Sequence, residues 1–312
     1  MQGWGKTAAG SSRWRCLSCK KSNIIHRPDT RRRHEKDRLV EWLTGVQSKD
    51  DIAEKYGLSR RALTKEFRQF FGRDLEPRIP SDLNADILIV DGKWIQGREM
   101  CVLVAVTEKD RIFWRFAKDE CYGTWFGFLV HFPPPKVVVA DGHKGMAGFV
   151  KKWWPRTDFQ RCHFHMVLLI VKYLTMNPRE EAGREILALT HRLKYVKTHE
   201  DKEQWLLFHR IWEKQYEKVF AERTEAGHFS KKKLRSVRGI MRRAIPDLFT
   251  YLDYPGCPNT TNLVEGWVNT AIGEAIGRHR GMKLWKKKTL VSVILSNLRR
   301  PLPKEKPTRE FP

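Results

Sequence analysis

The 312-residue sequence lacks the segments that mark membrane-spanning and secreted proteins. No apolar run approaches the roughly 18 residues of a membrane span, and the longest are short stretches such as residues 166–171. The opening residues, MQGWGKTAAG, contain no hydrophobic segment of the signal-peptide kind. Six scattered cysteines are too few for a disulfide scaffold in so long a chain. We therefore expect no membrane partner and a cytoplasmic location.

The sequence is also poor in acidic residues. Sixty Lys and Arg stand against 36 Asp and Glu, which leaves a net charge of +24. Because a fold gains nothing from so much self-repulsion, the excess indicates a polyanionic partner. Residues 1–80 contain 19 basic and 10 acidic side chains, residues 81–160 contain 11 and 10, and residues 161–312 contain 30 and 16. This distribution favours DNA that is held at two places around a nearly neutral centre.

Hydrophobic residues make up 41% of the chain, enough for a sizeable core in two or three domains. Residues 1–30 lack hydrophobic periodicity and contain a CxxC pair, Cys16 and Cys19. Such a pair can bind Zn²⁺ from one side, but a tetrahedral structural site needs four ligands. His26 and His34 are candidate substitutes, although their spacing matches no common zinc motif. Zn²⁺ at this pair stays an open alternative.

Residues 31–76 are expected to form a helix-turn-helix DNA-binding domain. The apolar pattern predicts helices over residues 34–46 and 49–71, and a Gly-containing turn at 57–59 divides the second. Ser59 is placed to cap the helix that follows the turn. An ordinary helical hairpin is the alternative. The residues suited to DNA contact are Ser59, Arg60, Arg61, Lys65 and Arg68.

After residue 80 the sequence contains short apolar runs. They predict a strand-rich α/β domain with a mixed sheet over residues 84–165. A buried-strand run lies in residues 85–95 and is expected to end in Asp91. Two strands are expected over residues 100–117, around a turn at 108–110, and further strands over 136–141 and 159–165. Helices are expected over residues 124–132 and 145–155.

The remaining chain is predicted to be helical. Residues 166–257 have a 3.6-residue apolar period and are expected to form an all-helical insertion. Residues 258–300 return to the core with a helix over 260–277 capped by Thr or Asn, and residues 301–312 are expected to be a disordered tail. Basic residues expected to contact DNA here, unless they are merely solvated, are Lys231, Lys232, Lys233 and Arg280.

Two aspartates, Asp91 and Asp141, are each expected to close a hydrophobic strand, and each precedes a glycine. Carboxylates at strand ends converge at one edge of a sheet, where burial is costly unless a cation compensates them. Mg²⁺ takes such oxygen ligands, and a third carboxylate is needed to hold two metal ions about 3.5–4 Å apart. Glu265 is the best candidate. The alternative is that each Asp merely forms a turn.

Several segments resemble, in the right order, the Mutator-type DDE transposases, a superfamily that includes many bacterial insertion-sequence transposases. The matching segments are LIVDGKWI, VVVADGHKGM, QRCHFH and TTNLVEGWVN, followed by RHRGM. The stretch GWGKT…RWRCLSC resembles the second half of the zinc ribbons that open many of these proteins, so we expect a truncated ribbon or a start placed too late.

The resemblance implies an RNase H-like catalytic core with an all-helical insertion. It also implies that Asp91, Asp141 and Glu265 form a triad that binds two Mg²⁺ or Mn²⁺ ions. The family has a Cys-x-x-His motif, matched here by Cys162 and His165, whose role stays open. These residues could bind zinc, contact DNA or the metal-bound phosphate, or pack in the core.

By the same resemblance, the protein is expected to cleave the ends of an insertion sequence and to join the 3′-OH ends to target DNA. Its partners would be the double-stranded DNA of the terminal inverted repeats and of the target, with a homodimer or higher oligomer in the synaptic complex. A nucleoid-associated protein of a prokaryote is implied. The alternatives are a DNA-binding regulator with an inert catalytic domain and a nuclease that cuts without joining.

Overall fold

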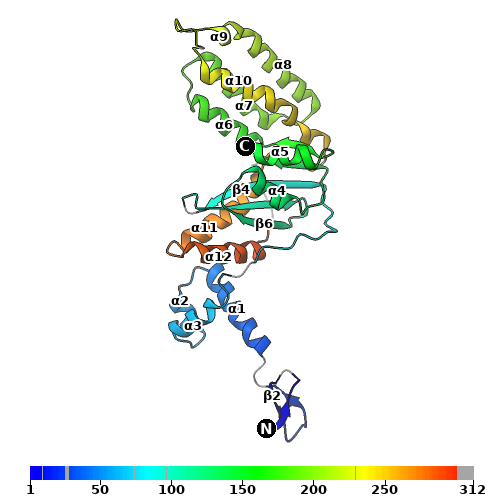
Figure 1. The fold of residues 1–312 in the computed structure, drawn as a ribbon, viewed down its shortest axis with the longest axis vertical. Helices are drawn as coiled ribbons and strands as arrows, with labels where there is room; N and C mark the ends of the chain where they lie inside the picture. The colour runs from blue at the N-terminus through cyan, green and yellow to red at the C-terminus, as the bar shows by residue number, and fades with distance from the viewer. Residues whose placement is uncertain (9, 25–27, 73–74, 96, 229, 301–312) are drawn as a thin grey trace, which may run out of the picture. The chain divides into compact units, whose positions relative to one another are not determined.

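The computed structural model describes residues 1–300 except 9, 25–27, 73–74, 96 and 229. The predicted tail at 301–312 and the candidate ligand His26 lie outside the described residues. The chain forms two compact units, one of residues 1–75 with 271–298 and the other of residues 76–270 with 299–300 (Figure 1). None of the helices in the described part is both long and apolar enough for a membrane span.

The first unit begins with a small antiparallel sheet of three strands in the order β1-β2-β3. The strands are β1 (Gln2–Lys6), β2 (Ser12–Arg15) and β3 (Ser22–Asn23). Their side chains are mostly exposed, so this sheet contributes little to a hydrophobic core. Cys16 and Cys19 lie in the turn that joins β2 to β3.

Five helices make up the rest of the first unit: α1 (Pro28–Thr44), α2 (Lys49–Lys55), α3 (Arg60–Arg68), α11 (Thr270–Arg278) and α12 (Leu284–Asn297). The prediction for Ser59 is confirmed, because its side chain accepts a hydrogen bond from the Ala62 N–H at 3.1 Å and caps α3. Gly57, at a φ of +62°, makes the turn between α2 and α3. One hydrophobic core joins these helices through Leu39, Trp42, Leu43, Ile52, Leu63, Phe67, Ala275, Leu290, Val293 and Ile294.

The second unit is built on a mixed five-stranded sheet with the order β6-β5-β4-β7-β8. Its strands are β4 (Ile87–Ile95), β5 (Met100–Thr107), β6 (Ile112–Ala117), β7 (Val137–Ala140) and β8 (Asp158–Arg161). The first three form an antiparallel meander, whereas β7 and β8 join in parallel. The α/β class and the mixed sheet expected from the sequence are therefore confirmed.

Helices α4 (Tyr122–Leu129) and α5 (Lys144–Trp153) cover the face of the sheet to which Leu88 and Val90 contribute (Figure 1). Successive residues of a strand point to opposite faces, so Ile89 and Asp91 belong to the other face. There a π-helical segment, η4 (Leu263–Asn269), packs against β4 and β5. The hydrophobic core under α4 and α5 therefore lies on one face of β4, and Asp91 lies on the other face.

Two strand ends were predicted wrongly. Asp91 does not close its strand but lies inside β4, opposite Val104, because β5 pairs with β4 as far as Ile95. The strand expected over 159–165 stops at Arg161, because its only partner in the described sheet, β7, ends at Ala140. The chain then turns into α6 (His163–Leu174), so residues 162–165 of the segment QRCHFH lie at a helix start rather than in a strand.

The helices expected after residue 166 form a bundle (Figure 1). After α6 come α7 (Glu181–Arg192), α8 (His199–Gln215), α9 (Glu217–Ala221) and α10 (Lys232–Ala244), with short 3₁₀ turns η1 (Leu193–Tyr195), η2 (Ile245–Asp247) and η3 (Thr250–Asp253). Buried aromatic and aliphatic residues of these helices share one core, against which partly buried residues of η2 and η3 pack. Of the expected Thr or Asn cap before Glu265, Asn262 makes no side-chain cap bond, whereas the Thr260 hydroxyl accepts a hydrogen bond from the Asn262 N–H at 3.4 Å.

Candidate active site

Strand register brings Asp91 and Asp141 to the same edge of the sheet. The parallel pairing of β4 with β7 aligns Ile87 with Val137 and Ile89 with Val139, so two further residues along the strands bring Asp141 beside Asp91. The Asp141 carboxylate accepts a hydrogen bond from the His143 N–H at 2.7 Å, which fixes its direction. The two aspartates are therefore neighbours in this register, although Asp91 lies inside β4 and not at its end as predicted.

Glu265 reaches the same place from η4. In a π-helix, hydrogen bonds run from residue i to i+5, so side chains four apart share a side of the segment. Asn269, four residues after Glu265, donates a hydrogen bond from its amide nitrogen to Asp91 Oδ2 at 2.8 Å. Asn269 thereby orients Asp91 and anchors η4, with Glu265 on it, to β4.

The pKa of Asp91 shows that burial and the neighbouring charges act on this carboxyl. Burial raises the pKa of Asp91 to about 7; His165 opposes this rise, and the charges of Glu265 and Asp141 add to it. A carboxyl with such a pKa is about half protonated at neutral pH, because its charged form has too little compensation. A cation bound among the three carboxylates would supply that compensation.

The donor set fits a hard divalent cation. Three carboxylates offer the oxygen ligands that Mg²⁺ and Mn²⁺ prefer. The buried Oδ1 of Asn269 has no hydrogen-bond partner among the described residues, which leaves one more oxygen beside Asp91. Asp91, Asp141, Glu265 and the Asn269 amide are therefore the residues that could hold such ions.

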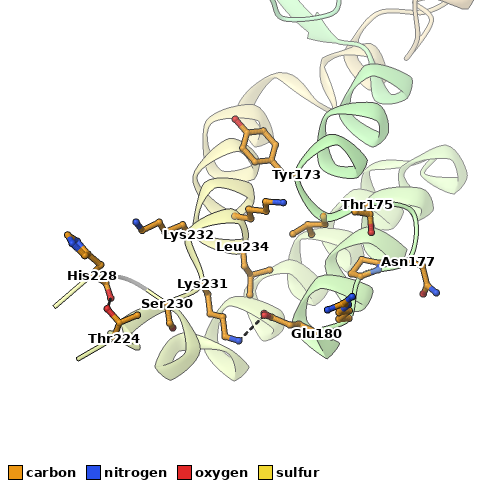
Figure 2. Close-up of a pocket in the computed structure, with 14 residues that line it drawn as sticks. Tyr173, Thr175, Asn177, Glu180, Thr224, His228, Ser230, Lys231, Lys232 and Leu234 are labelled. Carbon is orange, nitrogen blue, oxygen red and sulfur yellow. Dashed lines mark hydrogen bonds and ion pairs between the residues drawn. The ribbon is translucent and has the colours of Figure 1, made fainter. Parts of the chain in front are cut away.

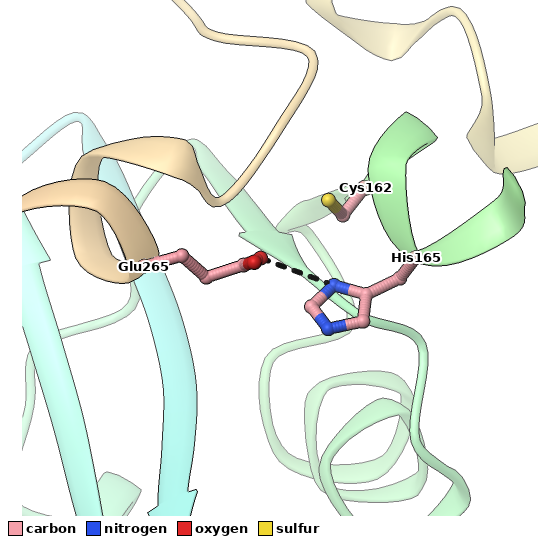
Figure 3. A group of neighbouring side chains, drawn as sticks. All are labelled: Cys162, His165 and Glu265. Atoms are coloured by element: carbon pink, nitrogen blue, oxygen red, sulfur yellow. Dashed lines mark ion pairs between the residues drawn. The ribbon is translucent and has the colours of Figure 1, made fainter. Parts of the chain in front are cut away.

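A second group overlaps the first at Glu265. The Cys162 thiol and the His165 imidazole, both from the start of α6, face the Glu265 carboxylate (Figure 3). His165 Nδ1 lies 3.5 Å from Glu265 Oε1. Thr261 lies among them: its backbone N–H donates to Cys162 Sγ at 3.3 Å, and its hydroxyl hydrogen-bonds Glu265.

The two histidines of the segment QRCHFH, His163 and His165, have opposite environments. Burial disfavours the charged form of His165, but Cys162, Glu265 and Asp91 outweigh it and raise its pKa to about 9. His163 points away from the acids and forms a hydrogen bond with the Leu248 carbonyl at 2.6 Å. Burial lowers the pKa of His163 to about 4. His165 is therefore the cationic partner of the acids, whereas His163 is a neutral core residue.

Arg161, the last residue of β8, is a site residue that sequence reasoning missed. A Cβ on Gly142 would meet the Arg161 guanidinium at 2.6–2.8 Å, so the glycine makes room for this side chain directly beside Asp141. Burial lowers the pKa of Arg161, and the charges of Asp141 and Asp247 oppose that shift. The quoted segment QRCHFH contained this signal, since its Arg immediately precedes the cysteine.

The other candidate site residues belong to the first unit and to the helical bundle. In the first unit, Arg61, Lys65, Arg68 and Arg280 are exposed, Arg60 pairs with Asp50 at 3.1 Å, and the Ser59 side chain is occupied as a cap. In the helical bundle, Lys232 and Lys233 are exposed, while Lys231 pairs with Glu180 at 2.8 Å. The structure thus places the Cys-x-x-His pair beside Glu265, and Asp91 where the charges of Glu265 and Asp141 act on it, and it keeps the predicted DNA contacts at the surface.

The CxxC pair near the amino terminus has only part of a metal site. Hydrogen bonds from the backbone of Cys19 and Ser18 lower the pKa of Cys16 to about 7, which favours the thiolate that binds metals. Among the residues that the structure describes, no third His, Cys, Asp or Glu joins this pair in a ligand group.

No curated protein matches the chain. One protein-family model matches it, that of the Mutator family of transposases, over residues 35–272. This range includes Asp91, Asp141, the Cys162–His165 pair and Glu265, and it covers well over half of the chain. The resemblance drawn from the short segments is thereby confirmed: the chain belongs to the Mutator family of transposases.

Proposed function

We propose that this transposase acts by DDE chemistry: it cleaves the ends of an insertion sequence and joins the freed 3′-OH ends to target DNA. Asp91, Asp141 and Glu265 would hold two Mg²⁺ or Mn²⁺ ions for these steps. One observation carries the proposal, namely that Asp91 is buried where the negative charges of Glu265 and Asp141 act on it, so that burial first and these charges second raise its pKa to about 7. Such mutual repulsion is kept where a cation or a reaction makes use of it.

The chain's own residues prepare the site. Asn269 orients Asp91, the His143 N–H orients Asp141, and the Thr261 hydroxyl orients Glu265. When bound, the ions would activate the attacking water or 3′-OH and stabilise the leaving 3′ oxygen. The Arg161 side chain, next to Gly142, adds a positive charge beside Asp141 that can neutralise a DNA phosphate.

The fold and surface support the finer parts of this proposal. The mixed sheet, an antiparallel meander extended by two parallel strands, supports an RNase H-like core with residues 163–253 as its helical insertion. Helices α2 and α3, joined at Gly57 and capped by Ser59, support a helix-turn-helix that reads the terminal repeats through Arg61, Lys65 and Arg68.

The helical bundle supports a second DNA contact. An open hollow of about 890 Å³, where lysines and hydroxyl groups gather, is lined by residues 173–175, 177–180, 224, 228 and 230–234 (Figure 2). Lys232 and Lys233 are exposed there, and Thr224 and Ser230 add hydrogen-bonding groups. Such a surface suits the phosphates of double-stranded DNA, and a homodimer or higher oligomer would bring two element ends together.

A strand-transfer assay with a terminal-repeat substrate, target DNA and Mg²⁺ or Mn²⁺ tests the proposal. We expect cleaved and joined products from the wild type and neither from Asp91→Asn, Asp141→Asn or Glu265→Gln. Asp86→Asn is the matched control, because Asp86 just precedes β4 but is exposed and pairs with Lys136 at 2.8 Å. Cleavage without joining would instead identify a nuclease, and DNA binding without cleavage a regulator. Full activity in Asp91→Asn would refute the triad.

A further inference from the structure

One group of side chains has a composition that the magnesium chemistry does not explain. Cys162, His165 and Glu265 place a sulfur, an imidazole nitrogen and a carboxylate oxygen all within 4.8 Å of one another (Figure 3). It is the single group of three or more such ligand residues found in the described part of the chain. Mg²⁺ prefers oxygen ligands and rarely binds a thiol, whereas sulfur and nitrogen ligands together favour Zn²⁺.

The spacing of the atoms is close to that of a tetrahedral zinc site. With Zn–S near 2.3 Å and Zn–N and Zn–O near 2.0 Å, neighbouring ligand atoms lie about 3.3–3.6 Å apart. His165 Nδ1 and Glu265 Oε1 are 3.5 Å apart, and the Thr261 hydroxyl lies 3.3 Å from Cys162 Sγ and 3.5 Å from His165 Nδ1. Contraction by about 1 Å at the widest separation would complete the geometry, with Thr261 or water as the fourth ligand.

The local structure prepares these ligands. Cys162 is the residue before α6 and His165 lies in its first turn, so the two side chains, three positions apart, project to the same side. His163 does not compete, because its ring is bonded to the Leu248 carbonyl. Cys162 is fully buried, but the side chains of His165 and Glu265 are 27% and 22% exposed, which leaves an entry path from solvent.

We propose that Cys162, His165 and Glu265 form a zinc site. It is a second metal site beside the magnesium site, and Glu265 is a ligand common to both. A carboxylate drawn toward Zn²⁺ is withdrawn from Asp91 and Asp141, so Zn²⁺ and the catalytic ions compete and Zn²⁺ holds the protein inactive. The binding itself is independent of the proposed DDE reaction. Only the inhibition rests on the proposed function.

Co²⁺, a spectroscopic substitute for Zn²⁺, tests the binding on the full chain. The Cys16→Ser/Cys19→Ser variant serves as the background, because it removes the other thiol pair. We expect one equivalent of Co²⁺ to give a sulfur-to-cobalt absorption band and the visible bands of a tetrahedral ion, both abolished by Zn²⁺. Cys162→Ser should remove the sulfur band, and Glu265→Gln should weaken Co²⁺ binding by about 10- to 100-fold or more.

Cys257→Ser is the matched control, because Cys257 is a buried cysteine outside the group and should keep the full spectrum. Circular dichroism of each variant checks folding, and His165→Ala gives a second route should Cys162→Ser fail to fold. The site is refuted if the background protein gives no sulfur band, or if the band survives in Cys162→Ser or is unchanged in both His165→Ala and Glu265→Gln.

Strand transfer at millimolar Mg²⁺ tests the competition. Added micromolar Zn²⁺ should inhibit the reaction, a chelator should restore it, and the Zn²⁺ concentration for half inhibition should rise with Mg²⁺. Inhibition that is independent of the Mg²⁺ concentration would contradict the proposal that Glu265 binds both metals. A protein that gives the cobalt spectrum but neither cleaves nor joins DNA would contradict the proposed DDE function and leave the zinc site standing.

Discussion

Two acidic residues of the second unit, Glu213 in the helical bundle and Asp91 in the sheet, are both partly withdrawn from water. Burial raises the pKa of each, but Arg242 and Arg238, which donate to Glu213 at 2.6 and 3.1 Å, reverse the effect and lower the pKa of Glu213. Asp91 has two acids as neighbours, and its pKa rises to about 7. The bundle thus neutralises the charge of Glu213 internally, whereas the charge of Asp91 in the sheet is poorly compensated.

The two environments therefore have different consequences, one for the stability of the fold and the other for ligand binding and catalysis. An ion pair that closes within the chain supports the fold and leaves nothing for a ligand to complete. Converging carboxylates reduce stability until a cation arrives, which is the usual sign of a functional site. Variants of the two regions should therefore have opposite effects on stability and on activity.

The largest expected effect comes from removing the charge of Asp91. Asp91→Asn should lower strand transfer by at least about 10³-fold, because a metal ligand is lost. The same change should raise the free energy of unfolding of the metal-free protein at pH 8 by about 1–3 kcal/mol, because a poorly compensated carboxylate becomes neutral. Chemical denaturation in the presence of EDTA measures the gain. A loss of stability in that experiment would contradict the charge deficit.

The second prediction concerns pH. The pKa of Asp91 is near 7 in the folded protein against an ordinary value of 3.8. A raised folded pKa gives stability that is complete below about pH 4 and is lost as pH rises to 7. Without metal, the free energy of unfolding should therefore fall over this range, by up to about 4 kcal/mol. The raised pKa of His165, about 9, extends the decline above pH 6.5.

Mg²⁺ should show the complementary trend. Because the cation binds the ionised carboxylate, its apparent affinity should rise with pH up to about 7 and then level off. Denaturation curves with and without Mg²⁺, from pH 4 to 9, measure both trends. In Asp91→Asn the fall below pH 7 should disappear, and a wild-type profile that rises from pH 4 to 7 would disprove the assignment.

The third prediction tests the bundle. Glu213→Gln leaves Arg238 and Arg242 without their carboxylate and should lower the free energy of unfolding by about 1–3 kcal/mol. Activity per folded molecule should stay near that of the wild type. Glu180→Gln is the matched control: Glu180 is more exposed, pairs with Lys231, and should cost less than about 0.5 kcal/mol. An equal loss in the two variants would remove the contrast between the regions.

Part of this arrangement could be predicted from local sequence. The apolar runs before Asp91 and Asp141 each ended in Asp-Gly, and parallel pairing of β4 with β7 was enough to align the two acids. The position of Ser59 after a Gly-containing turn predicted its cap on α3. The cap depends on residues a few positions apart, whereas the alignment of the acids also needs the distant strands β4 and β7 to pair.

Other features depend on contacts between distant segments. Asn269 bonds Asp91 across 178 positions of sequence, and Arg161 fits over Gly142, 19 positions away. The end of β8 was predicted wrongly, because it is determined by the length of its neighbour β7 rather than by the residues after Arg161. The hydrogen bond from Asn269 to Asp91 therefore depends on how η4 packs on the sheet, and no local sequence pattern predicts that packing.

The smallest expected effect concerns DNA binding by the bundle. Lys232 and Lys233 are exposed, so a phosphate can replace their water, whereas Lys231 already pairs with Glu180. Lys232→Gln/Lys233→Gln should weaken DNA binding several-fold on every sequence and reduce the salt slope of the affinity by about 2. Lys231→Gln should change the slope less, because its charge is compensated within the chain. Fluorescence anisotropy from 50 to 200 mM salt measures these slopes. Equal effects of the three lysines would mean that internal pairing does not decide which charges of the bundle remain for DNA.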